Sequence, residues 1–461
     1  MRLSIRSCIP VTLLVALALV CPAAFSWSNH SFVAYRAFEK MPEVTNAPPV
    51  SAESLEAFLK AEEKAIQALL ISQEVWAQNN LEKYPSRPAA LAFQVDPDRS
   101  DEARRLAFLM ALRVAPTSKF ALYIQPDPQQ TQPSGNSGNS GNALTHSAVN
   151  TLPQDANSTY RYQTLRPGEM VSALAVLASA SDEPDYGLDI NLWDDSPSEW
   201  GKRYGFGALP FGNPSLPYAT QAPFHMGFYH ESRVLYLAAP FIKRTFPLLR
   251  INQFSTLSAL AFRTGHTYWG WRFAGLALHY LQDLTQPYHA SLAPGHSTTG
   301  LLWVNLLAMA GASGKKNDTV VLLSNRHLAL EKYQIELLQR AARNKQDTSL
   351  EAALRNMGKD GSYPAWSDRY VRDVVAAQAA AYGSQVVSTL ESSMPAAFIS
   401  DPSFDFGVKE SEIDLTSELA KRDPEDRNRL EAMIAELLGN FGAHSRTAVR
   451  GILKESHGTT P

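Results

Sequence analysis

Long apolar runs are scarce in this sequence of 461 residues. The most apolar stretch, Ile9–Val20, has twelve residues, whereas an α-helix needs roughly 20 to cross a bilayer. Two arginines precede this stretch, and small side chains at Ala24 and Ser26 follow it. The pattern predicts a secretory signal peptide over residues 1–26, cleaved after Ser26. We therefore expect a secreted or periplasmic protein with no transmembrane segment in the mature chain.

Cysteine is nearly absent as well. Cys8 and Cys21 are the two cysteines, and both lie in the predicted signal peptide. The mature chain would then have no thiol for a disulfide or for a metal site. Any zinc would be bound by nitrogen and oxygen atoms, whereas closed structural zinc sites commonly use cysteine. This absence favours an enzyme over a secreted binding protein in which zinc only stabilises the fold.

The sequence has no excess of positive charge. It contains 42 basic and 45 acidic side chains, and loss of the two arginines of the signal peptide changes the net charge from −3 to −5. A chain of this charge has no general attraction for the phosphates of nucleic acid. Walker-type loops and dinucleotide fingerprints are also missing. We therefore expect no stable complex with nucleic acid.

Apolar residues at helical spacing are what the sequence has in abundance. Hydrophobic residues of all kinds make up 45% of the chain, enough for one large core. Few segments show the alternation of apolar and polar residues that is typical of strands. Ser51 is a predicted helix cap, Asp423 and Pro424 predict a helix start, and Gly439 predicts its end. The sequence predicts an all-α fold, a single large helical domain over residues 27–461. The predicted helices are Ser51–Trp76, Arg104–Val114, Glu169–Ala180, Glu231–Ala239, Arg272–Gln286, His327–Arg343, Asp373–Leu390 and Glu425–Leu438.

Two segments interrupt the helical pattern. Pro126–Asn142 is a tract of proline, glycine, serine and asparagine, which predicts a mobile loop outside the core. Asp185–Phe224 is rich in proline, glycine and aromatic residues. Loops of that length in a compact domain tend to line functional sites. Most of the aromatic side chains in the second segment are nevertheless expected to pack.

The segment His279–His289, HYLQDLTQPYH, has the strongest chemical signal. His279 and Asp283 are four residues apart on a predicted helix, so their side chains project from one face. Pro287 interrupts the hydrogen-bond ladder and bends the chain, which presents His289 at a different angle. Two nitrogen donors and a carboxylate arranged in this way predict a metal site.

Two further groups support this site by their residue types. His327 and Glu331 share a helix face at a spacing of four residues. Cleavage after Ser26 would make Trp27 the first residue, and its free amine and carbonyl can chelate a metal together with nearby His30. Each group alone has an ordinary explanation, a solvated ion pair or a packing residue.

An acidic turn and two histidines complete the candidate set. Asp185 lies in the turn, and His225 and His230 follow it in the sequence. The spacing does not choose between the two histidines. Taken alone, an acidic turn usually faces solvent and has no further role.

Taken in order, these groups resemble the zinc-dependent phospholipase C family of bacteria and, more distantly, the zinc-dependent single-strand nucleases that share its fold. The family pattern begins with tryptophan at the mature N-terminus, a nearby histidine, an aspartate turn and another histidine. It continues with H-Y-L-x-D-x-x-x-P-x-H and H-x-x-x-E. This sequence shows every part over Trp27–Glu331, with two insertions at about 85–165 and 297–324.

The resemblance implies a cluster of three Zn²⁺ ions. It also implies that Asp185 takes a proton from the attacking water. The implied ligands are Asp185, His279, Asp283 and one of His225 or His230 for the first ion, His289, His327 and Glu331 for the second, and Trp27, His30 and a bridging Asp283 for the third.

The activity implied by the resemblance is that of a phospholipase C. Such an enzyme hydrolyses the phosphodiester of glycerophospholipids such as phosphatidylcholine to diacylglycerol and a phosphorylated head group, with transient contact with a membrane surface. A single-strand nuclease or nucleotidase on the same fold is the alternative. Glu331 resembles the phospholipases, because the nucleases usually have aspartate at that position, and Tyr280 and Ala290 also match the phospholipase form.

Leu301–Ala310, LLWVNLLAMA, lies in the second predicted insertion. Ten mostly apolar residues suit a short core helix, and they suit equally a lip that contacts lipid beside the metal site. Replacement of Leu302 and Leu306 by aspartate would separate the two interpretations, because loss of activity on bilayers alone indicates a lip and unfolding indicates a core helix.

Overall fold

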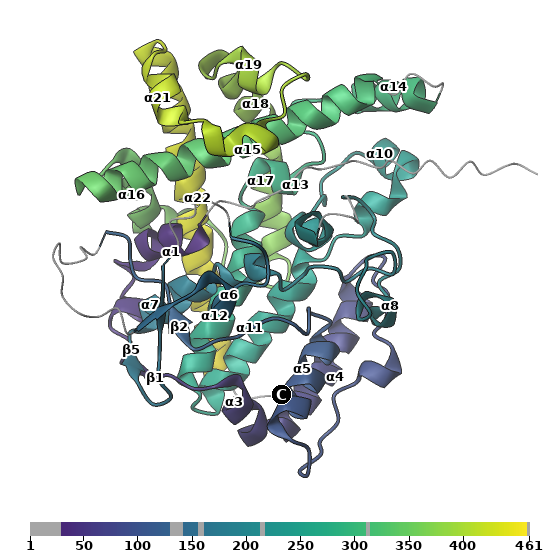
Figure 1. The fold of residues 1–461 in the computed structure, drawn as a ribbon, viewed down its shortest axis with the longest axis vertical. Helices are drawn as coiled ribbons and strands as arrows, with labels where there is room; N and C mark the ends of the chain where they lie inside the picture. The colour runs from purple at the N-terminus through teal and green to yellow at the C-terminus, as the bar shows by residue number, and fades with distance from the viewer. Residues whose placement is uncertain (1–28, 130–141, 155–160, 213–216, 310–313, 459–461) are drawn as a thin grey trace, which may run out of the picture.

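The computed structural model describes residues 29–129, 142–154, 161–212, 217–309 and 314–458. The predicted signal peptide, Trp27 and most of the tract Pro126–Asn142 lie outside these residues. Helix accounts for 64% of the structure and strand for 3%, so the predicted all-α class is confirmed (Figure 1). No helix in the described ranges combines the length and apolar character needed to cross a bilayer.

Short helices occur throughout the chain, and the two longest, α15 and α22, lie in its second half. The helices up to α10 are α1 (His30–Phe38), α2 (Pro42–Thr45), α3 (Leu55–Ala61), α4 (Glu63–Asn80), α5 (Asp101–Leu112), α6 (His146–Val149), α7 (Ala173–Ala180), α8 (Gly201–Tyr204), α9 (Ala222–His225) and α10 (Arg233–Ala238). The helices that follow are α11 (Pro247–Arg263), α12 (Thr267–Asp283), α13 (Pro287–Ala290), α14 (Thr298–Met309), α15 (Gly314–Asn344), α16 (Ser349–Arg355), α17 (Ala377–Ala381), α18 (Gly383–Ser393), α19 (Ala396–Ile399), α20 (Phe406–Lys409), α21 (Leu415–Ala420) and α22 (Pro424–His457).

The few strands form two small antiparallel sheets. β1 (Val50–Ser51) pairs with β5 (Met170–Val171). In the other sheet, β4 (Tyr162–Thr164) lies between β2 (Tyr123–Ile124) and β3 (Ala143–Leu144). These sheets join segments far apart in the sequence and contribute little to the core.

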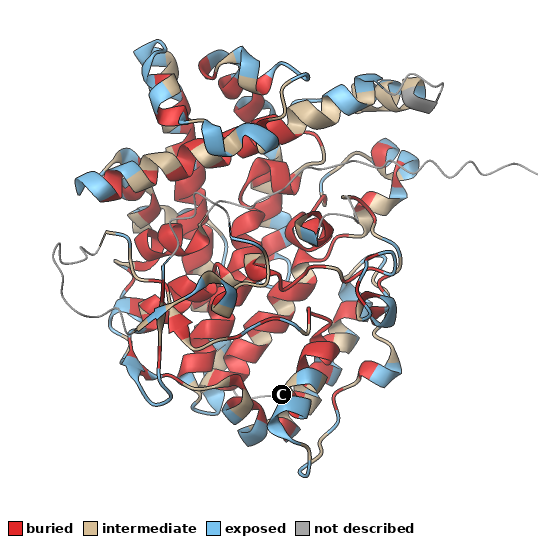
Figure 2. Cartoon of the chain, in the orientation of Figure 1, coloured by how far each residue is buried: buried red, intermediate tan, exposed pale blue. Residues whose placement is uncertain are grey.

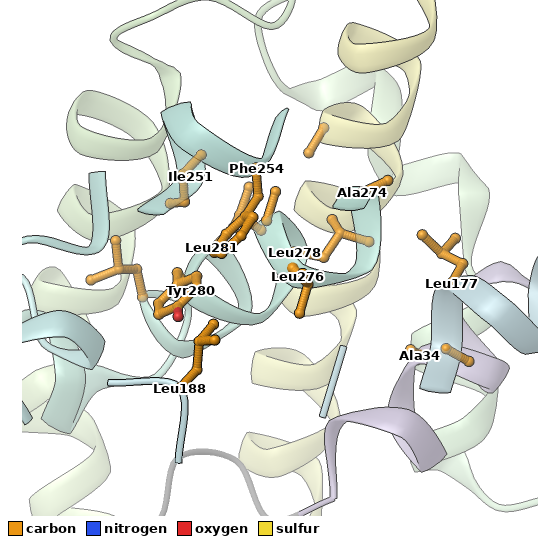
Figure 3. Close-up of a cluster of buried hydrophobic side chains, with 14 of the residues drawn as sticks. Ala34, Leu177, Leu188, Ile251, Phe254, Ala274, Leu276, Leu278, Tyr280 and Leu281 are labelled. Carbon is orange, nitrogen blue, oxygen red and sulfur yellow. The ribbon is translucent and has the colours of Figure 1, made fainter. Parts of the chain in front are cut away.

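The centre of the molecule is α12, which is buried on every side. Each of its residues from Tyr268 to Asp283 is buried, and the helix packs against α7, α11 and α22. Figure 3 shows the apolar side chains around it, where the rings of Tyr280 and Phe254 stack with their centroids 6.2 Å apart. A helix enclosed in this way must be mostly apolar. Polar side chains on it therefore need partners within the protein.

A close approach between α7 and α12 positions the segment that follows α7. A methyl group at Gly275 would lie 2.5 Å from the carbonyl oxygen of Leu177, a separation that side chains do not tolerate. Glycine thus lets the two helices touch through their backbones. The contact brings the turn at Ser181, directly after α7, against the metal-site face of α12.

Several predicted helix ends are wrong. Ser51 lies in β1, and Ser54 caps α3 instead, its hydroxyl accepting from the Ala57 amide at 3.2 Å. Asp423 caps α22 as predicted, but the helix continues through Gly439 to His457. α16 packs against α22, close enough at Gly439 for an added Cβ to meet Ala353 of α16, and this packing outweighs the low helix propensity of glycine. Asp373–Leu390 divides into a π-helical turn (Val371–Ala376), α17 and α18.

The two predicted insertions differ in how they pack. The first, at about 85–165, contributes to the core through α5, which buries Phe108, Leu109 and Leu112. The second contains α14, in which no residue with a described side chain is buried (Figure 2). The interpretation of Leu301–Ala310 as a core helix is therefore wrong.

Candidate metal centre

Eight of the predicted ligand side chains converge in the structure, from six elements. Seven of them are buried, and the side chain of Asp185 is 19% exposed. The eight are His30 on α1, Asp185 in a 3₁₀ turn (Glu183–Tyr186), His225 on α9, His279 and Asp283 on α12, His289 on α13, and His327 and Glu331 on α15.

The first group of donors surrounds His279. Its Nδ1 donates to the Ser181 carbonyl oxygen at 2.7 Å. Its Nε2 lies 3.0 Å from His225 Nδ1 and 3.5 Å from Asp283 Oδ2. His225 Nδ1 and Asp283 Oδ2 are 2.9 Å apart, and Asp185 Oδ1 lies 3.6 Å from His279 Nε2. Four possible metal-ligand atoms therefore lie close together: His279 Nε2, His225 Nδ1, Asp283 Oδ2 and Asp185 Oδ1.

Asp283 has histidines at both of its oxygens. Oδ2 faces His225, while Oδ1 lies 3.2 Å from His30 Nε2. The ring of His30 is oriented by Gln282, because His30 Nδ1 donates to Gln282 Oε1 at 2.8 Å. A carboxylate with separate donors at its two oxygens has the geometry of a bridging ligand.

The second group consists of His289, His327 and Glu331. His289 Nδ1 donates to the His225 carbonyl oxygen at 2.8 Å, which leaves Nε2 3.1 Å from His327 Nε2. Glu331 Oε1 lies 2.8 Å from His327 Nε2 and accepts from Gln286 Nε2 at 2.9 Å. Pro287 is the first residue of α13, so the predicted change of direction before His289 is confirmed.

Hydrogen bonds alone do not satisfy the nitrogen and oxygen atoms of these eight side chains. A carbonyl oxygen can only accept, so His279 and His289 have their proton on Nδ1 and, when neutral, a lone pair on Nε2. Each lone pair faces a nitrogen of another histidine at 3.0–3.1 Å. Among the described residues, Asp185 Oδ1 and Glu331 Oε2 also have no hydrogen-bond donor. Buried polar atoms without partners are costly, and a cation would satisfy both the histidine lone pairs and the carboxylate oxygens.

The environment of the cluster raises the pKa values of four of its groups, two histidines and two carboxylates. Burial lowers the pKa of His30 and of His225, but hydrogen bonds and charge from nearby carboxylates outweigh burial and raise the pKa values to about 9 and about 10. Burial raises the pKa of Asp185 to about 7 and that of Glu331 to about 8. Metal ligands must be deprotonated, so metal binding at this cluster would release protons.

Asp189 is a supporting residue that the sequence analysis missed. Its Oδ2 lies 3.6 Å from His225 Nε2, on the side of the ring opposite the donor group. The same carboxylate accepts from Tyr280 Oη at 2.6 Å and pairs with Arg250. A carboxylate behind a metal-binding histidine fixes the orientation of the ring. Its position four residues after Asp185, in the same segment, was the available signal.

The predicted ligands outside this cluster are His230 and Trp27. His230 does not lie in it: the ring is at the surface, where Nε2 donates to the Arg372 carbonyl oxygen at 2.7 Å. Of the two alternative ligands, His230 therefore lies too far from the other ligands to bind the same ion. His225 lies in the cluster because α9 ends against α12. Trp27 lies outside the described residues.

The structure thus contains several groups of histidine, aspartate and glutamate that could hold a metal ion. Each has its ligand atoms within 4.8 Å of one another. The three groups are His30, Asp185 and His279; His225, His279 and Asp283; and His289, His327 and Glu331. In comparisons with known proteins, no family model, no curated protein and no solved structure matches this chain.

Proposed function

We propose that this protein is an exported zinc-dependent phospholipase C that hydrolyses glycerophospholipids such as phosphatidylcholine to diacylglycerol and a phosphorylated head group. The observation that most directly supports the proposal is the set of adjoining ligand groups on α12, α13 and α15. All of their donors are nitrogen or oxygen atoms, as in zinc sites that keep a position open for water or substrate. Their order along the chain also matches the phospholipase C pattern.

Three ions would share the donors as the sequence resemblance implies. Two of the implied sets coincide with groups that the geometry brings together, and the third depends on the bridging position of Asp283 between His30 and His225. The sets are Asp185, His225, His279 and Asp283; His289, His327 and Glu331; and Trp27, His30 and Asp283.

Asp185 is the residue that we assign to accept a proton from the attacking water. When bound, zinc supplies positive charge to the phosphate oxygens and makes water acidic enough to be a nucleophile near neutral pH. Asp185 is the most exposed of the eight side chains, and its Oδ1 has no hydrogen-bond donor among the described residues. It therefore lies where water and substrate reach the cluster.

The surroundings of the cluster favour lipid over nucleic acid. Aromatic side chains that would stack on nucleobases need exposure, but Trp193, Tyr204 and Phe211 of the segment Asp185–Phe224 are buried. The exposed apolar helix α14, in contrast, directly precedes α15, the helix of His327 and Glu331. An apolar surface beside a phosphate site suits a membrane substrate.

The proposal can be tested with the full chain expressed with its own leader, so that cleavage after Ser26 can occur. Hydrolysis of phosphatidylcholine and of single-stranded DNA would be compared, with and without a chelator and after zinc is restored. We expect phosphatidylcholine to be cleaved, chelator to abolish cleavage and zinc to restore it. Hydrolysis of DNA alone would contradict the phospholipase assignment, and chelator-resistant hydrolysis would contradict the metal mechanism.

A substitution tests the role of Asp185 as the proton acceptor. Asp185→Asn should lower kcat on phosphatidylcholine by at least about a hundredfold, the usual contribution of general acid–base catalysis. The matched control is His230→Ala, which also removes a titratable side chain of the predicted set but lies at the surface. The assignment of Asp185 is wrong if both variants retain full activity.

A further inference from the structure

α14 is a largely apolar helix that the protein covers only in part. Its twelve residues, Thr298–Met309, include no charged side chain, and Figure 2 shows it without a buried segment. Trp303 and Leu306 are 59% and 54% exposed. A helix that is apolar on all sides is normally enclosed by protein or by lipid. The described part of the chain provides no such enclosure for α14.

α10 adds a second exposed apolar edge next to α14. The two helices are in contact, and Thr298 Oγ1 donates to Ser232 Oγ, at the N-cap of α10, at 3.1 Å. Val234 and Leu237 on α10 are 53% and 84% exposed. They are three residues apart, so they lie on one side of the helix. The four exposed side chains together form what we call the α10–α14 surface: Val234, Leu237, Trp303 and Leu306.

An apolar cavity lies between α10, α14 and α15. It has a volume of about 50 Å³, and its wall includes Leu301 on α14 and Leu323 on α15. Leu292, also in the wall, comes three residues after His289. Leu323 comes four residues before His327, a distance of about 6 Å along the helix. The α10–α14 surface and the metal centre therefore share their supporting elements.

The segment of the chain that contains α10 and α14 has few acidic residues, although the chain as a whole has a net charge of −3. Between Glu231 and Asp318 the sequence has one acidic residue, the buried Asp283. Glu231 faces inward, because its Oε1 accepts from the Leu292 amide at 2.7 Å. Arg233 lies in α10, Lys243 follows α10, and Lys315 and Lys316 follow α14, ahead of Asp318.

A second cavity, of about 290 Å³, opens on another side of α10. Its wall includes three cations, Arg233, Lys243 and Arg372. Lys243 pairs with Glu82 at 2.8 Å, and Arg372 lies 3.7 Å from Asp373. No ion pair involving Arg233 occurs within the described residues, so the cavity has a net positive charge. Its size and charge suit the phosphate of a lipid head group.

The order of residues around α10 places the apolar edge between the two cavities. Successive residues turn by about 100°. Arg233 and Tyr236 line the cationic cavity, and Leu235 and Ala238 line the apolar one. Val234 and Leu237 fall between them and point outward.

We propose that the α10–α14 surface docks the protein on a bilayer that contains anionic phospholipid. The four apolar side chains enter the interface, and the cationic cavity holds a lipid phosphate. Apolar side chains flanked by basic residues are the combination that binds anionic membranes. Docking would place the metal centre within reach of lipid head groups, so the biological role of the surface rests on the proposed function. Vesicle binding itself can be measured independently of that function.

The test measures vesicle binding directly, by cosedimentation in the presence of chelator. Vesicles of phosphatidylcholine, with and without phosphatidylglycerol, would be mixed with the full chain and with the double variant Leu237→Asp/Leu306→Asp. The matched control is Leu106→Asp on α5, which changes a leucine of similar exposure, 50% against 54%, at the other end of the molecule (Figure 1). Unfolding midpoints would establish that each variant folds.

We expect the double variant to bind vesicles at least tenfold more weakly, and Leu106→Asp to bind like the parent. Arg233→Gln should weaken binding about fivefold, the share of one basic residue near a membrane, and only when phosphatidylglycerol is present. Unchanged binding of the double variant would overturn the proposal. A change from dimer to monomer without loss of vesicle binding would overturn it too, by assigning the surface to a second copy of the chain. Vesicle binding as expected without hydrolysis of phosphatidylcholine would refute the proposed function alone.

Discussion

Asp189 joins a buried arginine, a buried tyrosine and a histidine of the metal centre. Its Oδ1 accepts from Arg250 Nε at 2.8 Å and lies 2.7 Å from Arg250 Nη2. Its Oδ2 accepts from Tyr280 Oη and faces His225 Nε2. The substitution Asp189→Asn keeps the shape of this side chain and removes its charge. It therefore tests both the stability of the core and the support of the metal centre.

The expected loss of stability follows from the surroundings of Arg250. Removing one partner of a buried ion pair costs about 3–5 kcal/mol, because the other charge is left without compensation. Arg250 would keep its hydrogen bonds to the carbonyl oxygens of Leu112 and Arg113 and to Gln253 Oε1. The asparagine oxygen can also replace Oδ1 as an acceptor. We therefore expect the lower end of the range, about 3 kcal/mol.

The expected effect on the metal centre is separate. Outer partners of metal ligands typically contribute 10- to 100-fold to metal affinity, and Asp189 is the carboxylate behind His225. Asp360→Asn is a matched control. Asp360 pairs with Arg446, another fully buried arginine, which has three carbonyl acceptors, and also with Arg450. Neither ion pair involves a residue of the candidate metal centre. The control should lose stability to a similar extent and keep its metal affinity.

Two measurements decide the outcome. Urea unfolding in the presence of chelator gives the change in unfolding free energy without a contribution from bound metal. Competition with a chromophoric chelator gives the zinc affinity. The reasoning is refuted if Asp189→Asn is destabilised by less than 1 kcal/mol, or if Asp189→Asn and Asp360→Asn bind zinc equally well.

Two further predictions concern packing and ligand choice. Gly275→Ala should lower the unfolding free energy by about 1–3 kcal/mol, because the new methyl group meets Leu177. Gly439→Ala, whose new methyl group has no neighbour closer than 3.6 Å, should raise it by about 0.5–1 kcal/mol. Equal urea midpoints for the two variants would contradict the close packing of α7 on α12. His225→Ala should reduce the zinc content of the purified protein and His230→Ala should not, and the reverse result in metal analysis would show that the cluster is assembled differently.

Local features of the candidate site could be predicted from the sequence, because they depend on residues within one or two helical turns. His279 and Asp283 share a face of α12 through their spacing of four, and His327 and Glu331 do so on α15. The break at Pro287 was predictable for the same reason, since proline lacks the backbone donor that a continuing helix needs. The all-α class followed from the apolar spacing.

Helix ends were less predictable, because packing competes with local propensity. Gly439 is a poor helix former, yet α22 continues past it as α16 packs alongside. α14 shows the opposite case. Its sequence is apolar enough for a core helix, but the fold leaves it at the surface. Composition alone does not determine which apolar helices are enclosed.

The sequence by itself determined which residue types could bind a metal and which of them share a helix face. Only the tertiary structure decided that His225 rather than His230 lies beside Asp283, and that Asp189 lies behind it. The contact of His225 with Asp283 joins residues 58 positions apart, that of His225 with Asp189 joins residues 36 positions apart, and the contact between His30 and Gln282 spans 252 positions. Helical spacing acts over three or four residues. Contacts at the longer range depend on how α1, α7 and α9 pack around α12, which is set by the burial of side chains throughout the molecule.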